Sequence, residues 1–301
     1  MFWADLNRFG QEGRPCLFVI SYDKTEGAVF PLENLPPFID YAFNAPVSNH
    51  KIALKPKPLP AETYRKKFDA LQRQIDAGNS YLANLTQPTP LANNENLETL
   101  YRGADAPFKL LWRDRFVCFS PEPFVTIEGN TIRAFPMKGT TEGDPQRLID
   151  SAKELGEHTM VVDLLRNDLA QVAKNVRVEK WRYLQKAGTL WQTSSQIAGD
   201  LPPSWRARLG DLLQTLLPAG SVSGAPKKKT VEILEAIEGY DRGFFTGVFG
   251  VFDGQNLQSA VMIRFIEQGT NGLVFKSGGG VTYESDAQSE YSELIAKVRL
   301  P

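Results

Sequence analysis

Short apolar runs rich in β-forming residues recur along the chain, and most of them are bounded by Gly, Pro, Asn or Asp. This pattern is typical of short strands separated by turns. The possible turn at Gly129-Asn130 and the turn at Asp253-Gly254 each divide two such runs. Strands are predicted at 15–23, 28–31, 108–112, 116–119, 125–133, 176–184, 189–198, 244–252, 257–266 and 273–277. The run 78–86 leads into a further predicted strand.

Helical periodicity occurs between these runs. The clearest case has Tyr64, Phe68, Leu71 and Ile75 at helical spacing, followed by Gly78 as a C-cap. Helices are also predicted from Asp144-Pro145 through Leu155, at 157–170, at 204–217 before Pro218, at 226–238 before Gly239, and at 285–299 with Ser285 and Gln288 as a capping box.

Many antiparallel-looking strands with interspersed helices favour an α+β fold over a regular βαβ fold. A proline-rich link at 55–60 separates a short N-terminal segment from the rest of the chain. We therefore expect residues 1–60 to be a β-rich segment that contributes to the same fold. Residues 61–301 are expected to form one compact domain.

Composition narrows the function. The 301 residues carry 34 basic and 35 acidic side chains, and 42% of them are hydrophobic. No block of like charge is longer than Lys227-Lys228-Lys229, which argues against nucleic acid or an anionic membrane as the main partner. Cys16 and Cys118 lie in apolar runs, where each is expected as a buried small hydrophobe. Without a signal peptide or an apolar stretch of spanning length, a cytoplasmic protein is the default expectation.

The C-terminal helix carries the first candidate chemistry. Glu290, Glu293 and Lys297 share one helix face, and two glutamates one turn apart can bind a hard cation. The alternative is a solvated face with a Glu293–Lys297 pair. Gly278, Gly279 and Gly280 precede this helix and could offer amides to an anion, or could form a β-bulge or tight turn.

Three further residues are ambiguous by themselves. Lys138 lies between Pro136 and Gly139, where a solvated loop charge is the common outcome. Glu122 ends an apolar strand and is either a general acid or an ordinary edge glutamate. Glu157 is expected to open an apolar helix. Phosphate-loop, dinucleotide-binding and nucleophile-elbow motifs are absent from the sequence.

In this order, the motifs resemble those of the chorismate-utilising enzymes. The matching pieces cover about the last 240 residues and are SPEPF (120–124), FPMKGT (135–140), EHTMVVDLLRND (157–168), PAGSVSGAPK (218–227), Ile263-Arg264, and SGGG (277–280) followed by SEYSELIAKV (289–298). The resemblance implies the anthranilate synthase component I-like fold, in which two large, mostly antiparallel sheets pack as a sandwich with helices outside.

Lys138 distinguishes members of this family. The matching position is typically alanine in anthranilate and isochorismate synthases and lysine in aminodeoxychorismate synthases. The resemblance therefore implies amination of chorismate through a covalent lysine adduct, on the route to p-aminobenzoate and folate, with ammonia from a glutamine amidotransferase subunit. Anthranilate synthase component I, isochorismate synthase and a non-catalytic chorismate-binding paralogue are the alternatives.

The same resemblance assigns the remaining roles. Glu122 would be the general acid, and Glu157, Glu290 and Glu293 would hold Mg²⁺. The substrate-binding residues would be Thr140, Ser221, Arg264, Gly278, Gly279, Gly280 and Lys297. Two positions depart from the family pattern: Gln192 stands where relatives often carry histidine, and Phe245 where some carry a substrate-facing tyrosine.

Overall fold

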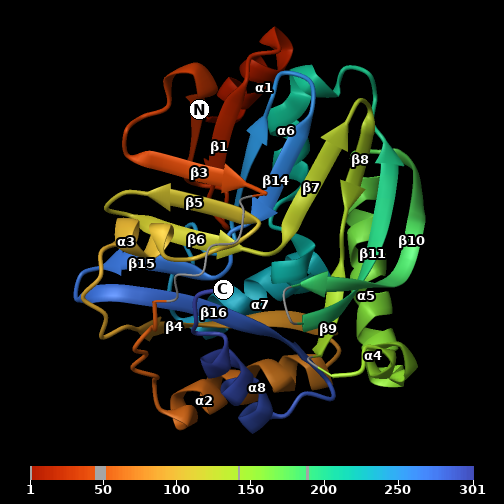
Figure 1. Cartoon of the computed structure of the whole chain (residues 1–301). Coiled ribbons are helices and arrows are strands. Elements are labelled where there is room, and N and C mark those ends of the chain that lie inside the picture. Colours follow the sequence, from red (N-terminus) through yellow and green to blue (C-terminus); the bar gives the residue numbers. More distant parts are fainter. Residues whose placement is uncertain (1, 45–51, 142, 188–189) are drawn as a thin grey trace.

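The computed structural model describes residues 2–44, 52–141, 143–187 and 190–301. Within them, two antiparallel sheets form the centre of the molecule (Figure 1). The first sheet has the order β10 (Lys174–Ala187), β11 (Leu190–Asp200), β8 (Thr131–Ala134), β7 (Pro123–Glu128), β14 (Leu257–Val261), β13 (Val248–Phe252), β1 (Cys16–Ile20) and β2 (Gly27–Pro31), and β9 (Met137–Thr141) also pairs with β11. The second sheet has the order β12 (Gly224–Ala225), β4 (Leu82–Pro90), β16 (Gly272–Thr282), β15 (Phe265–Gly269), β6 (Phe116–Ser120), β5 (Phe108–Trp112) and β3 (Ile39–Phe43).

Helices cover the outer faces of both sheets (Figure 1). Those of the first sheet are α1 (Phe2–Glu12), α4 (Gln146–Asp150), α5 (Ala152–Ala170) and α6 (Leu209–Leu216). Those of the second sheet are α2 (Ala61–Asp76), α3 (Leu97–Arg102), α7 (Lys227–Glu238) and α8 (Ala287–Ala296). Short 3-10 turns are η1 (Leu32–Asn34), η2 (Trp205–Arg208) and η3 (Gly220–Val222).

Strand β1 is buried on both faces because an apolar layer covers each side of it. In β1, Leu17 and Val19 point into the core between the sheets, where they meet side chains of β13 and β6. Cys16, Phe18 and Ile20 point the other way, into the core under the outer helices. All five residues of β1 are buried, as expected for a strand between two apolar layers.

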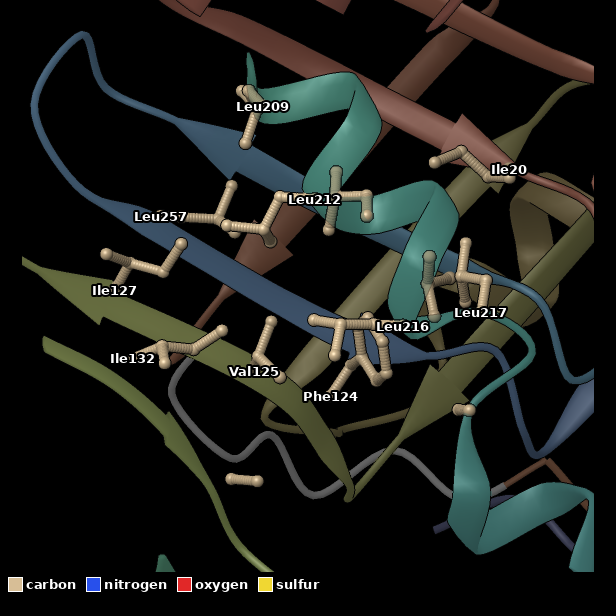
Figure 2. Close-up of a cluster of buried hydrophobic side chains, with 14 of the residues drawn as sticks. Ile20, Phe124, Val125, Ile127, Ile132, Leu209, Leu212, Leu216, Leu217 and Leu257 are labelled. Carbon is tan, nitrogen blue, oxygen red and sulfur yellow. The ribbon is translucent and has the colours of Figure 1, made fainter. Parts of the chain in front are cut away.

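Helix α6 shows how the outer layer is held. Its leucines point onto β14, β7 and β8, where Leu212 and Leu216 lie over Leu257 and Val125 (Figure 2). These side chains are removed from water almost completely. Burying one such side chain contributes about 1.5–3 kcal/mol, so this face anchors the helix.

The α+β sandwich with outer helices is therefore confirmed. The helix over 64–75 and the turn at Gly129 are also found, the latter with φ +59° between β7 and β8. Cys16 and Cys118 are buried free thiols, as expected. The division at residue 60 stays a prediction; β1 and β2 join the first sheet and β3 the second.

Other expectations were wrong. The run 257–266 is two strands, because the chain leaves the first sheet after Val261 and enters the second at Phe265. The capping box is also wrong: Asp286 caps α8 by accepting from Ser289 N–H, and Ser285 bonds Glu290 instead. Helices α1 and α3 were not predicted. In the described residues, no helix has the length and apolar character needed to span a membrane.

Because α1 packs closely on η2, alanine substitutions at two helical glycines should differ in their effect on stability. A Cβ at Gly10 would lie 2.0 Å from the carbonyl oxygen of Arg206, whereas one at Gly156 would meet nothing within 4 Å. We expect Gly10→Ala to lower the free energy of unfolding by about 1–3 kcal/mol. Gly156→Ala should leave it unchanged or raise it by up to about 1 kcal/mol. Urea unfolding measures both; equal effects would contradict this packing.

Candidate active site

A β-bulge presents Lys138. In the ladder between β9 and β11, Lys138 lies opposite Thr193 and Thr140 opposite Gln192, so Gly139 has no opposite residue. Its φ is +73°, and a Cβ there would lie 2.5 Å from Glu154 Oε2. Only glycine suits this position, and the extra residue re-aims the neighbouring side chain.

The Lys138 amine is enclosed by groups from two other elements. Its Nζ lies 3.6 Å from Glu157 Oε2 on α5, and its side chain is only 23% exposed. Strand β16 approaches from another side, since a Cβ at Gly280 would lie 3.2 Å from the same Nζ. Lys138 is therefore a strand residue in a polar site, and the solvated loop charge is wrong.

Glu122 lies between β6 and β7 in the same region. Its backbone N–H donates to Ser120 Oγ at 3.1 Å. The Ser221 hydroxyl of η3 lies close enough to the Glu122 carboxyl to lower its pKa. Burial raises the pKa of Glu122, against the opposing effects of Ser221 and of the Lys138 charge. A raised pKa favours the protonated form, which a general acid requires.

Helix α8 lies along the glycine run. Lys297 Nζ contacts Glu293 at 2.8 Å and donates to the Gly278 carbonyl at 2.9 Å. A Cβ at Gly279 would lie 3.0 Å from Glu290 Oε2. The Glu293–Lys297 pair, which was the alternative to a cation site, is present. The same helix face also contacts strand β16.

The three glycines form neither a β-bulge nor a tight turn. They pair with Thr86, Leu85 and Asn84 of β4 in regular register within β16. On the other edge of β16, β15 pairs only as far as Lys276. Alternate residues of an antiparallel strand point their N–H and C=O groups to the same edge. The amide of Gly280 therefore faces the edge where Lys297 meets Gly278, and can donate to an anion there.

Glu157, Glu290 and Glu293 supply the oxygen donors that Mg²⁺ prefers. Burial raises the pKa of Glu290, with further contributions from the charges of Glu293 and Glu157, against Ser285 and Lys297. A divalent cation would offset this repulsion. Among the residues described, however, no three acidic, His or Cys side chains are gathered as a ready metal cluster. The carboxylates suit the ion in donor type, while Glu157 and Glu293 each face a lysine.

Arg264 lies where the chain crosses between the sheets, with φ +51°. Its Nη1 donates to the carbonyl of Lys297 at 2.8 Å, so it touches the end of α8. Burial lowers its pKa, as does the charge of Arg299. The side chain of Thr140 lies outside the described residues.

The two departures from the family pattern have different surroundings. Gln192 Nε2 lies 3.2 Å from Met137 Sδ, beside Lys138 in β9. Phe245 is 2% exposed, and its ring lies 5.9 Å from that of Phe265 between centroids, inside the core between the sheets. Phe245 therefore packs in the hydrophobic core.

The sequence predicted that Glu157 opens its helix, and this is wrong. Helix α5 begins at Ala152 and is capped by Ser151, so Glu157 lies in its second turn. The next residue, His158, is fully buried, and its Nε2 lies 2.7 Å from Ser195 Oγ. Sequence reasoning missed this pair; the only signal was the place of His158 directly after Glu157.

The chain belongs to the chorismate-binding enzyme family, whose model matches residues 39–301. An uncharacterised PabA-like protein of Pasteurella multocida is 46% identical over this whole chain and 98% of its own length. Aminodeoxychorismate synthase component 1 of Escherichia coli is 32% identical over 79% of this chain. The match covers 56% of that protein, so this chain corresponds to little more than half of it.

Solved structures agree on the fold. Anthranilate synthase component I from Streptococcus pneumoniae has a TM-score of 0.72 and 26% identity, over 83% of this chain and 60% of that one. MenF, the menaquinone-specific isochorismate synthase of Escherichia coli, has a TM-score of 0.78 over 97% of this chain and 79% of that one. Its identity is only 14%, so it supports the fold alone.

His158 predicts a pH dependence of stability. Burial, followed by the charges of Arg182 and Lys138, lowers its pKa from 6.5 to about 4. The unfolded chain therefore binds a proton at a pH where the folded protein does not, and stability falls as pH drops below 6.5. From pH 7 to 5 we expect this residue to cost about 2 kcal/mol.

Urea unfolding at both pH values, compared with His158→Gln, isolates this contribution. Glutamine can keep a hydrogen bond to Ser195 but does not titrate. The variant should lose about 2 kcal/mol less than the unmodified protein between the two pH values. An equal loss would contradict a neutral His158.

Proposed function

We propose that this chain is an aminodeoxychorismate synthase component 1 that aminates chorismate at C4. The observation that carries the proposal is the position of Lys138. Its amine faces Glu157 at 3.6 Å and lies beside Gly280. Its charge also acts on the Glu122 carboxyl. Sequence identity does not decide between activities, since an anthranilate synthase of Haloarcula marismortui is 30% identical.

The lysine gives the reaction a covalent course. After its ammonium group has given up a proton to water, the Lys138 amine adds at C2 of chorismate, the ring double bond shifts, and the C4–O bond breaks. Ammonia then forms the C4–N bond, the double bond shifts back, and the C2–N bond to Lys138 breaks. One difficult displacement thus becomes two allylic ones.

Glu122 is the proposed acid for the leaving hydroxyl. Its raised pKa favours the protonated state, and the proton it gives to the C4 oxygen lets that group depart as water. The Ser221 hydroxyl would then stabilise the carboxylate that remains.

The remaining residues hold the substrate. Glu157, Glu290 and Glu293 would hold Mg²⁺, which when bound supplies positive charge for the ring carboxylate of chorismate. Arg264 is suited to the enolpyruvyl carboxylate because its guanidinium can form paired hydrogen bonds. Lys297 and the edge amides of Gly278 and Gly280 would assist; Gly279 would let helix α8 approach, and Thr140 would add a hydrogen bond.

Ammonia would come from a separate glutamine amidotransferase subunit or directly from solution. Neither cysteine resembles the nucleophile such a subunit needs, because both are buried and burial raises their pKa values. The product, aminodeoxychorismate, would require a lyase to yield p-aminobenzoate and pyruvate.

A product assay tests the proposal. The purified chain, given chorismate, Mg²⁺ and an ammonium salt, should form aminodeoxychorismate, which a coupled lyase converts to p-aminobenzoate. Chromatography separates this product from o-aminobenzoate and isochorismate. Either of the latter as main product would assign the anthranilate or isochorismate activity instead. Chorismate binding without turnover would indicate a non-catalytic paralogue.

The covalent role predicts the behaviour of Lys138→Ala. Loss of the nucleophile should lower the rate of aminodeoxychorismate formation by about 10³-fold or more. Lys66→Ala is the matched control, since Lys66 is an exposed lysine of α2 paired with Glu62. With chorismate and no ammonia, the unmodified protein should gain the mass of chorismate minus water, on the peptide that contains Lys138. A full rate in Lys138→Ala would refute the adduct.

A further inference from the structure

A buried ion pair lies against turn η3, which carries Ser221. Arg242 and Glu238 are each 3% exposed and form a two-pronged contact, with Arg242 Nε on Glu238 Oε2 and Nη2 on Oε1, both at 2.7 Å. The Thr86 N–H and hydroxyl also donate to Glu238 Oε1, at 2.8 and 2.7 Å. Glu238 is therefore fully bonded and holds the guanidinium in one orientation.

The rest of the guanidinium reaches the turn that carries Ser221. Arg242 Nη1 donates to the carbonyl of Val222 at 2.8 Å, and Nη2 donates to the carbonyl of Asn84 at 2.7 Å. Asn84 Nδ2 adds a second, longer bond to the Val222 carbonyl at 3.2 Å. Arg242 thus fixes turn η3 against strand β4 at the residue directly after Ser221.

We propose that Arg242 is a positioning residue that acts through Ser221, keeping its hydroxyl on the Glu122 carboxyl. The proposal rests on the proposed function of Glu122 as general acid. Arg242 itself reaches no proposed substrate group: its described contacts are with Glu238, Thr246, the Tyr22 ring and backbone carbonyls.

The hydrogen-bond geometry of Arg242 explains why lysine would not replace it. A lysine could keep the ion pair with Glu238, so the buried carboxylate would stay compensated. A single ammonium cannot reproduce the planar fork that reaches both the Val222 and the Asn84 carbonyls. Arg242→Lys therefore loosens the Ser221 turn while leaving Glu238 paired.

A double-mutant cycle tests this role. We expect Ser221→Ala and Arg242→Lys each to lower kcat by about tenfold, with smaller changes in KM. If Arg242 acts through Ser221, the double variant should also be only about tenfold slower, whereas independent effects would multiply to about 100-fold. Multiplying effects would overturn the proposal.

Arg182→Lys is the matched control. Arg182 is another buried arginine that donates to backbone carbonyls, those of Ile149 and Ser151 among them, on the side of α4. Its effect should multiply with that of Ser221→Ala. If it shows the same non-additivity, the coupling reflects general loosening and the proposal fails.

Two further measurements keep the outcome clear. Circular dichroism establishes that each variant is folded at the assay temperature. Should Arg242→Lys not fold, Asn84→Ala removes the second donor to the Val222 carbonyl and enters the same cycle, with non-additivity expected and additivity overturning the proposal. The product formed by the unmodified protein tests the proposed function separately, so failure of one does not imply failure of the other.

Discussion

The buried pair of Arg242 and Glu238 is the contact on which the surroundings of the site depend. It joins the end of α7, strand β4 and turn η3 through hydrogen bonds that leave Glu238 fully bonded. Lys276 of β16 donates to the carbonyl of Arg242, which adds the glycine strand to the same assembly. Breaking such a pair typically costs about 3–5 kcal/mol because the remaining charge is buried.

Around this assembly the candidate site is a set of paired charges. Lys138 faces Glu157, and Lys297 faces Glu293. Both lysine amines lie beside the glycines of strand β16. Burial raises the pKa of both the Glu122 and the Glu290 carboxyl. Under the proposed function, this site would bind the two carboxylates of chorismate and supply a proton for its amination.

Sequence patterns predicted the elements whose side chains repeat regularly. Helix α2 follows from apolar residues at helical spacing, and the sandwich follows from many short strands with turn residues between them. The patterns failed where tertiary contacts decide. The run 257–266 looks continuous, yet it crosses between sheets at Arg264, whose φ of +51° no periodicity reveals. Helix α1 was missed, and it packs on η2 through Gly10.

The sequence by itself determined the candidate residues. Their order along the chain also determined the family, to which residues 39–301 match. The tertiary structure decided their surroundings: that a bulge at Gly139 presents Lys138, that the glycines lie within a strand, and that Phe245 is in the core. The physical reason is that charge, burial and hydrogen bonding depend on neighbours far away in the chain. Glu122 and Ser221, or Lys138 and Gly280, become partners only when both sheets are assembled.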